Sequence, residues 1–227
     1  MPKDNKGPIN FQDLMLHRIH EILLVASQYD AFILEEDGRL TQQILYEYLG
    51  MNLSYAPRVW HAKNAKTGLQ MLAERSYDLV IVMMRISDMD PITFGEKVKK
   101  NFPDKPVILL AFDESEITTL PQKRLNKSID RVYIWSGNAN VFPAIIKNIE
   151  DSMNLERDQK IADIRSIVMV EDNPRYYSII LPLIYRTALK HAQNLISRSL
   201  SAVSYTHLRA HETREDLVWR LLREKKK

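Results

Sequence analysis

Short apolar runs alternate with amphipathic stretches along the N-terminal part of the chain. The apolar runs cover residues 21–27, 58–62, 77–84, 105–112 and 130–135, and they are rich in Val, Ile and Leu. Three of them are almost continuously apolar, which is typical of parallel strands buried on both faces. The alternation predicts an α/β domain over about residues 20–155, with five strands and five helices.

The stretches between the apolar runs have helical spacing. Leu40, Ile44, Leu45 and Tyr48 fall on one face of a helix near residues 37–49. The same spacing predicts helices over residues 66–75, 91–101 and 141–153. Pro121 interrupts the stretch after the fourth run, so the helix expected there is short or broken.

The strand pattern begins again after a charged, helix-compatible connector. The run "SIVMVEDNP" covers residues 166–174, and a helix-like segment that contains Pro182 follows it. We therefore expect a second domain of the same type that begins but is not completed. The predicted organisation is a leader over residues 1–15, a first domain over 16–155, a connector with a truncated second domain over 156–202, and a tail over 203–227.

Composition and charge narrow the class of protein only slightly. Of the 227 residues, 45% are hydrophobic and 27% are charged, as in an ordinary globular protein. No apolar run approaches the roughly 18 residues needed to span a bilayer, and the N-terminus has no secretory apolar region. The absence of cysteine excludes disulfides and thiolate sites and suits the cytoplasm. The net charge of +3 is concentrated in residues 207–227 without a nucleic-acid motif, so we expect neither a nucleic-acid nor a membrane partner.

The stretch "YDLVIVMMRISDMDPITFGEKV", residues 77–98, resembles the middle of a response-regulator receiver (CheY-like) domain. The resemblance implies a flavodoxin-like, three-layer fold with a five-stranded parallel sheet in the order 2-1-3-4-5. It also implies an active site where the strands end. An acidic pair follows strand one, a phosphate-accepting Asp follows strand three, a hydroxyl group follows strand four and a Lys follows strand five. In that family the carboxylates hold Mg²⁺, and the metal and the Lys offset the charge of the transferred phosphoryl group.

This chain departs from the receiver pattern at every chemical position. The corresponding positions hold, in the same order, Ala26 and Ser27, then Met83, then Ala111, and then Trp135 or Ser136. Methionine cannot be phosphorylated, and alanine cannot bind Mg²⁺. The pattern therefore predicts a degenerate receiver, or pseudo-receiver, with no catalytic residue and no cofactor in its first domain.

Acidic residues near these positions leave a second interpretation open. Asp88 and Asp90 match loop acids that face solvent in true receivers, and Asp78 precedes the third strand at the wrong end of the sheet for catalysis. The acids after the first strand allow two interpretations. They form a relocated metal site, or they are ordinary acids stabilised by solvent and by the dipole of the first helix. Those acids are Asp30, Glu35, Glu36 and Asp37.

The apolar run that begins the expected second domain, at residues 166–170, does keep an acidic pair. Glu171 and Asp172 in "VMVEDNP" match the start of a receiver domain, and they would bind Mg²⁺ if the second domain were complete. The alternative is an ordinary polar strand end without a metal.

The last segment, residues 203–227, resembles a translated sequencing-adapter read. If it folds, its spacing favours an amphipathic helix around residues 217–222, and otherwise it stays disordered. His207 and His211 have the i, i+4 spacing of some helical metal sites, but without a third ligand we predict no metal there.

These features together favour a non-catalytic, phosphorylation-independent regulatory module that belongs to a larger signalling protein. Residues 14–201 also resemble the tandem-receiver front of phosphoenolpyruvate-synthase-like proteins, which implies that the partners are other proteins or downstream domains, with a homodimer as a further option. The alternative is a phosphorelay response regulator that accepts phosphate through a complete second receiver domain. A small-molecule-binding flavodoxin-like domain is disfavoured, because the chain has only six glycines and no Gly-rich phosphate loop.

Overall fold

The computed structural model describes residues 16–37, 40–50, 56–162, 166–203 and 220–223. The chain divides into two compact units, and each is described by itself. The first, here called the sheet unit, consists of Ile19–Ile145 and Glu171–Ile184. The second contains the described parts of Met1–Arg18, Ile146–Val170 and Tyr185–Lys227.

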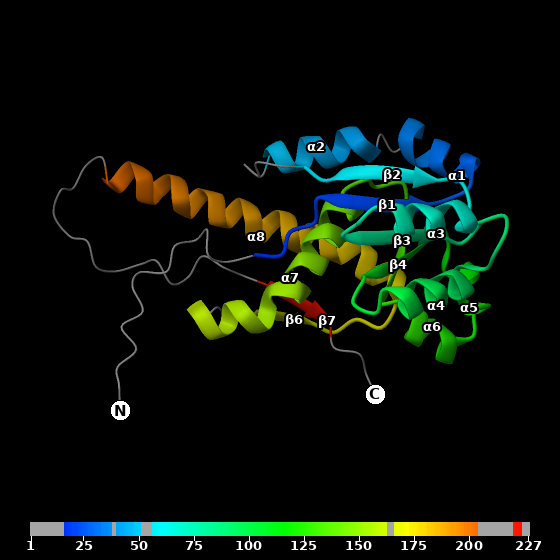
Figure 1. The fold of residues 1–227 in the computed structure, drawn as a ribbon. Coiled ribbons are helices and arrows are strands. Elements are labelled where there is room, and N and C mark those ends of the chain that lie inside the picture. Colours follow the sequence, from blue (N-terminus) through cyan, green and yellow to red (C-terminus); the bar gives the residue numbers. More distant parts are fainter. Residues whose placement is uncertain (1–15, 38–39, 51–55, 163–165, 204–219, 224–227) are drawn as a thin grey trace, which may run out of the picture. The chain divides into compact units, whose positions relative to one another are not determined.

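Five parallel strands form the centre of the sheet unit (Figure 1). They are β1 (Glu21–Val25), β2 (Arg58–Ala62), β3 (Leu79–Met83), β4 (Val107–Ala111) and β5 (Arg131–Ile134). Their order in the sheet is β2-β1-β3-β4-β5, which confirms the predicted flavodoxin-like fold class. Because all neighbouring strands are parallel, their carboxyl ends meet at one edge, here called the strand-end edge.

Helices connect these strands, and their bounds follow local sequence signals. The helices are α1 (Gln28–Phe32), the π-helix η2 (Ile33–Asp37), α2 (Leu40–Gly50), α3 (Ala65–Glu74), α4 (Pro91–Asn101), α5 (Glu114–Thr118), α6 (Gln122–Ser128) and the start of α7 (Val141–Ala162). Helix α4 begins where Asp90 accepts a hydrogen bond from the N–H of Thr93 at 2.9 Å. Pro121 separates α5 from α6, as its position in the sequence predicts.

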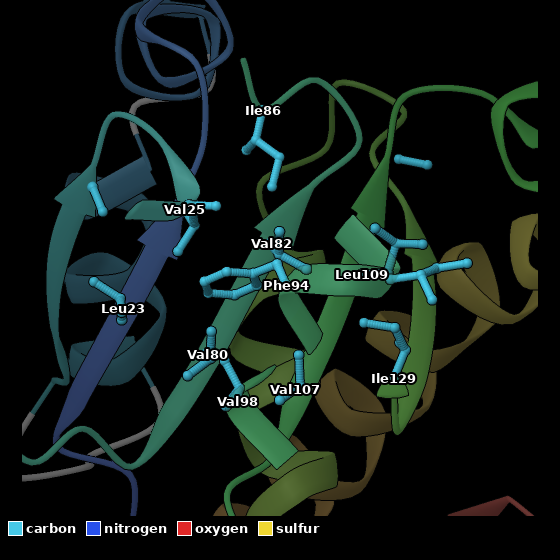
Figure 2. Close-up of a cluster of buried hydrophobic side chains, with 14 of the residues drawn as sticks. Leu23, Val25, Val80, Val82, Ile86, Phe94, Val98, Val107, Leu109 and Ile129 are labelled. Carbon is cyan, nitrogen blue, oxygen red and sulfur yellow. The ribbon is translucent and has the colours of Figure 1, made fainter. Parts of the chain in front are cut away.

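The core of the sheet unit lies between the sheet and helices α3, α4 and α6. Alternate residues of β1, β3 and β4 point into it, including Val25, Val82 and Leu109. Figure 2 shows Phe94 of α4 lying over these central strands, and its side chain is fully buried. Full burial of one such side chain stabilises a fold by about 1.5–3 kcal/mol. The remaining residues of β3 and β4 are buried as well, so the central strands are covered on both faces.

The first residues of helix α8 (Pro174–Val203) complete the sheet unit along β5. The ring of Tyr177 lies 5.7 Å from that of Tyr133, and Ser178 Oγ accepts a buried hydrogen bond from the N–H of Ile134 at 2.8 Å. An edge strand otherwise presents unpaired N–H groups, and Ser178 satisfies one of them. Residues 171–184, expected at the start of a second domain, therefore lie in the same compact unit as the five strands.

The second unit contains a two-stranded parallel sheet of β6 (Ser166–Met169) and β7 (Arg220–Arg223). Leu221 and Leu222 lie in β7, so the amphipathic helix predicted around residues 217–222 is wrong for these two positions. The physical reason is pairing with β6, where Leu221 is opposite Ile167. The spacing of apolar residues within a segment carries no information about a partner strand that is distant in the sequence. Among the helices within the described ranges, none combines the length and apolarity needed to cross a membrane.

Gly95 allows α4 to approach α6 closely, which gives a direct test of this packing. A Cβ atom at this position would lie 2.6 Å from the carbonyl oxygen of Ser128 and 3.1 Å from Ile129 Cδ1. We expect Gly95→Ala to destabilise the fold by about 1–3 kcal/mol, measured as the free energy of unfolding in urea. Lys97→Ala, on the exposed side of the same helix, is the control and is expected to change it little. An unchanged Gly95→Ala protein would contradict the close α4–α6 packing.

Candidate functional site

Apolar side chains occupy the strand-end edge where receiver chemistry is expected. Ala26 follows β1, Met83 ends β3 and Ala111 ends β4, and all three are completely buried. Trp135 follows β5. Its backbone N–H donates to the carbonyl of Ala111 at 2.7 Å, and its ring lies 5.4 Å from that of Phe142. These side chains offer no oxygen to a metal ion and no nucleophile to a phosphoryl group.

The two hydroxyl groups predicted at this edge have different surroundings. Ser27 is the N-cap of α1, and its Oγ accepts a hydrogen bond from the N–H of Asp30 at 3.0 Å. Ser136 is exposed after β5. Ser27 therefore has a structural role at the start of α1.

The loop after β3 is held by its two acids. Asp88 accepts hydrogen bonds from the N–H groups of Ala65 and Lys66, both at 2.8 Å, and so binds the start of α3. Burial acts to raise the pKa of Asp88, but these backbone hydrogen bonds outweigh it and hold the pKa below its ordinary value. Asp90 caps α4. Both acids are exposed, as predicted, yet each also fixes the position of a helix.

Asp78 lies at the opposite end of β3, as its place in the sequence predicts. Its Oδ2 accepts hydrogen bonds from the N–H groups of His20 and Glu21 at 2.8 and 2.9 Å. The carboxylate therefore joins the beginning of β1 to the beginning of β3, far along the strand from the strand-end edge.

Asp30 is the unusual acid of the strand-end edge. Its side chain is only 1% exposed, and neither carboxyl oxygen has a hydrogen-bond partner among the described residues. Burial raises the pKa of Asp30 above its ordinary value. The Ser27 hydroxyl and the charge of Arg85 act in the opposite direction, and the charge of Glu116 adds to the rise.

Of the other acids after β1, Glu35 is the one whose side chain the structure describes. Glu35 is exposed and accepts a hydrogen bond from the hydroxyl of Thr41 at 2.9 Å. The side chains of Glu36 and Asp37 lie outside the described residues. Within the part of the chain that the structure describes, no group of three or more His, Asp or Glu residues is arranged to hold a metal ion.

A salt bridge joins the loop after β3 to the helix after β4. Arg85 Nε and Nη2 both donate to Oε1 of Glu116, at 3.2 and 3.0 Å. The other oxygen of Glu116 accepts the N–H of Phe112 at 3.0 Å. No local pattern in the sequence indicates this pair, because its partners are 31 residues apart and belong to different elements.

Glu171 and Asp172, the predicted Mg²⁺ ligands, follow β6. Glu171 is half-buried and its Oε1 accepts the N–H of Asn173 at 2.9 Å, while Asp172 is exposed. A metal site at these two acids stays a prediction. The leader over residues 1–15 and the pair His207 and His211 lie outside the described residues.

A shallow hollow of about 240 Å³ lies away from the strand-end edge. Leu72, Tyr77, Phe102 and Lys105 contribute to its lining together with Arg75. The Arg75 guanidinium lies 4.2 Å from the ring centre of Trp60 and pairs with Glu21 at 2.9 Å. These contacts join the beginning of β1 and the middle of β2 to the end of α3, which is a stabilising arrangement.

Solved structures similar to this chain are receiver domains. The signal receiver domain of an HD domain-containing protein from Pseudomonas fluorescens has a TM-score of 0.43 and 23% identity, over 68% of this chain and 98% of that chain. A response regulator from Thermotoga maritima, in complex with Mg²⁺ and BeF, has a TM-score of 0.44 and 19% identity, over 57% and 97%. A CheY-like receiver domain from Methanospirillum hungatei has a TM-score of 0.46 and 20% identity, over 61% and 98%. No protein-family model and no curated protein matches the sequence.

Placing a carboxylate at the end of β3 tests how apolar this edge is. We expect Met83→Asp to destabilise the fold by roughly 2–5 kcal/mol, because a fully buried side chain would become polar without a partner. Met83→Leu, which conserves volume, is the control and is expected to cost less than about 1.5 kcal/mol. The measurement is urea unfolding at neutral pH. Equal stability of the Asp and Leu variants would show that the site is polar or hydrated.

Proposed function

We propose that the predicted first domain, residues 16–155, which contains the five strands of the sheet unit, is a non-catalytic regulatory module that binds protein partners and works without phosphorylation. The observation that carries the proposal is the complete burial of Ala26, Met83 and Ala111 at the strand-end edge. Phosphoryl transfer to a receiver needs a carboxylate acceptor and oxygen ligands for Mg²⁺ at these positions. Alkyl and thioether groups supply neither.

The contacts around the edge support a fixed loop arrangement in place of a phosphate-dependent one. In a true receiver, a phosphoryl group after the third strand binds a hydroxyl after the fourth and shifts the adjoining loop. Here Arg85 and Glu116 already link the corresponding loops, at 3.0 Å. This ion pair is partly exposed, so it fixes geometry more than it adds stability.

The partner in this proposal is another protein or a downstream domain of the same polypeptide. A larger signalling or phosphoenolpyruvate-synthase-like parent, or a homodimer, would use the module in the same way, through contacts of its surface. Exposed aromatic side chains of α1, Tyr29 and Phe32, are 67% and 61% exposed and are available for such contacts.

The alternative function is a phosphorelay response regulator that accepts phosphate through a complete second receiver domain. The order of strand β6, the acids Glu171 and Asp172, and helix α8 favours it, because a receiver begins with this order. In that case Mg²⁺ binds at the two acids, and the first domain remains inert.

Treatment of the full chain with acetyl phosphate and Mg²⁺ tests the proposal. We expect no phosphoryl adduct by intact-mass spectrometry, since the position of the acceptor carboxylate holds Met83. A receiver domain that keeps the aspartate, treated in the same tube, controls for the reagent. Acid-labile phosphate mapped to residues 16–155 would overturn the proposal. Mg²⁺-dependent changes in NMR chemical shift that are confined to Glu171 and Asp172 would favour the alternative.

A further inference from the structure

The outward side of helix α8 carries an apolar ridge where the helix belongs to the sheet unit. The side chains of Tyr176, Ile179 and Ile180 are 58%, 45% and 38% exposed. Residues three and four positions apart lie on one side of a helix, so these three side chains form one stripe, here called the α8 ridge. Large apolar side chains grouped in this way mark a contact surface, whereas single exposed ones are common on any protein.

The opposite side of the same helical turns is fixed on the sheet. Tyr177 and Leu181 are completely buried. The ring of Tyr177 packs against that of Tyr133, and Ser178 Oγ accepts the N–H of Ile134. The α8 ridge therefore cannot turn inward without breaking these contacts. It is a preformed surface on a rigid support, so a partner that binds there orders few groups of this chain.

The charge of helix α8 is of one sign. Its 30 residues include no Asp or Glu, and its cations are Arg175, Arg186, Lys190 and Arg198. Arg175 is exposed and directly precedes Tyr176 of the ridge. Arg175, Arg186 and Lys190 belong to none of the ion pairs among the described residues. The cationic side chain next to the ridge is thus available to an acidic partner.

Acidic side chains lie at the beginning of α8, where negative charge suits the helix dipole. Glu171 accepts the N–H of Asn173 at 2.9 Å, and Glu114 of α5 accepts Nδ2 of Asn173 at 2.9 Å. Asp172 precedes the helix. These acids come before the helix in the chain or belong to α5, so the helix that carries the ridge remains positive along its own length.

Charge and shape together select the occupant of the ridge. A second copy of α8 would bring further cations and no acid, and like charges that face each other oppose binding. A bilayer surface favours a broad apolar face rich in Trp, Phe and Leu, whereas the ridge is a narrow stripe of one Tyr and two Ile. A stripe with three- and four-residue spacing fits the apolar side of another helix, and the cations favour acids beside that side.

We propose that the α8 ridge binds an amphipathic helix of a protein partner whose apolar stripe is bordered by acidic side chains. Apolar side chains of that helix pack between Tyr176, Ile179 and Ile180, and its carboxylates pair with Arg175. The ridge lies outside residues 16–155. It is a contact surface beyond the proposed function of that domain, and it does not depend on whether the domain is phosphorylated.

A synthetic acidic peptide tests the ridge in the full chain. The probe is a fluorescein-labelled peptide of about 20 residues, long enough to form a helix, with Leu at three- and four-residue spacing and Glu and Ala elsewhere. We expect saturable binding by fluorescence anisotropy that weakens as salt is added. The controls are a peptide with the Leu positions shuffled and one with Lys in place of Glu. Equal binding of either control, or no saturable binding of the acidic peptide, would overturn the proposal.

Variants of the ridge identify where the peptide binds. Tyr176→Ala and Ile180→Ala are each expected to raise the Kd roughly tenfold, because each removes an apolar contact. Both side chains are exposed, so thermal unfolding is expected to be unchanged. Tyr29→Ala, which removes an exposed aromatic side chain from α1, is the matched control and should leave the Kd unchanged. An unchanged Kd in the two ridge variants, or an equal loss in Tyr29→Ala, would contradict binding at the ridge.

A charge reversal separates local pairing from overall attraction. Arg175→Glu and Lys97→Glu change the net charge equally, and both side chains are exposed on helices. We expect Arg175→Glu to weaken peptide binding several-fold more than Lys97→Glu and to reduce its salt dependence. Equal effects of the two variants would show that only the net charge attracts the peptide, and the proposal would then be wrong.

Other occupants of the ridge have their own readouts. Sedimentation equilibrium measures self-association, and co-sedimentation with phosphatidylglycerol vesicles measures membrane binding. We expect Tyr176→Ala to change neither, and a loss of either in this variant would overturn the acidic helix as the occupant. Failure here is distinct from failure of the proposed function. Phosphate on residues 16–155 would overturn that function and leave peptide binding intact, whereas a missing peptide complex in an unphosphorylated chain overturns only the ridge.

Discussion

The burial of β3 on both faces is the constraint on which the rest of the sheet unit depends. This strand lies in the middle of the sheet, between β1 and β4, and each of its residues is buried. A charged group at its end would need a metal ion, a cation or several hydrogen bonds to offset desolvation. With Met83 in that place, apolar packing continues to the end of the strand, and the neighbouring Ala26 and Ala111 continue it across three strands.

Polar contacts within the chain hold the loops around the strand-end edge. Asp88 binds the start of α3, Asp90 caps α4, and Arg85 pairs with Glu116 on α5. Each is a polar contact between a loop and a neighbouring element, and none needs a ligand. The strand-end edge thus has a defined loop geometry without metal-binding or phosphate-binding residues at the expected positions, which is the basis for the proposed role in protein contacts.

The periodicity of the sequence was sufficient to predict the strands and most helices. The helix predicted over residues 91–101 has these bounds as α4, since Asp90, Pro91 and Pro103 mark both ends locally. Long-range features could not be predicted in this way. Strand β7 depends on pairing with β6, and the Arg85–Glu116 pair depends on how two loops meet. For Asp30 a weak signal existed, because this acid stands among apolar residues in "QYDAFIL", but its burial follows from tertiary packing.

The central claim is that the strand-end edge of the first five strands cannot bind a phosphoryl group with its metal ion. Titration of the labelled chain with Mg²⁺ and beryllofluoride, followed by backbone amide spectra, tests it most directly. The account predicts unchanged amide signals for Ala26, Met83 and Ala111, whose side chains offer no ligand. Saturable shifts at these three positions would contradict it, because they would show that the edge accepts the phosphoryl analogue despite its apolar side chains.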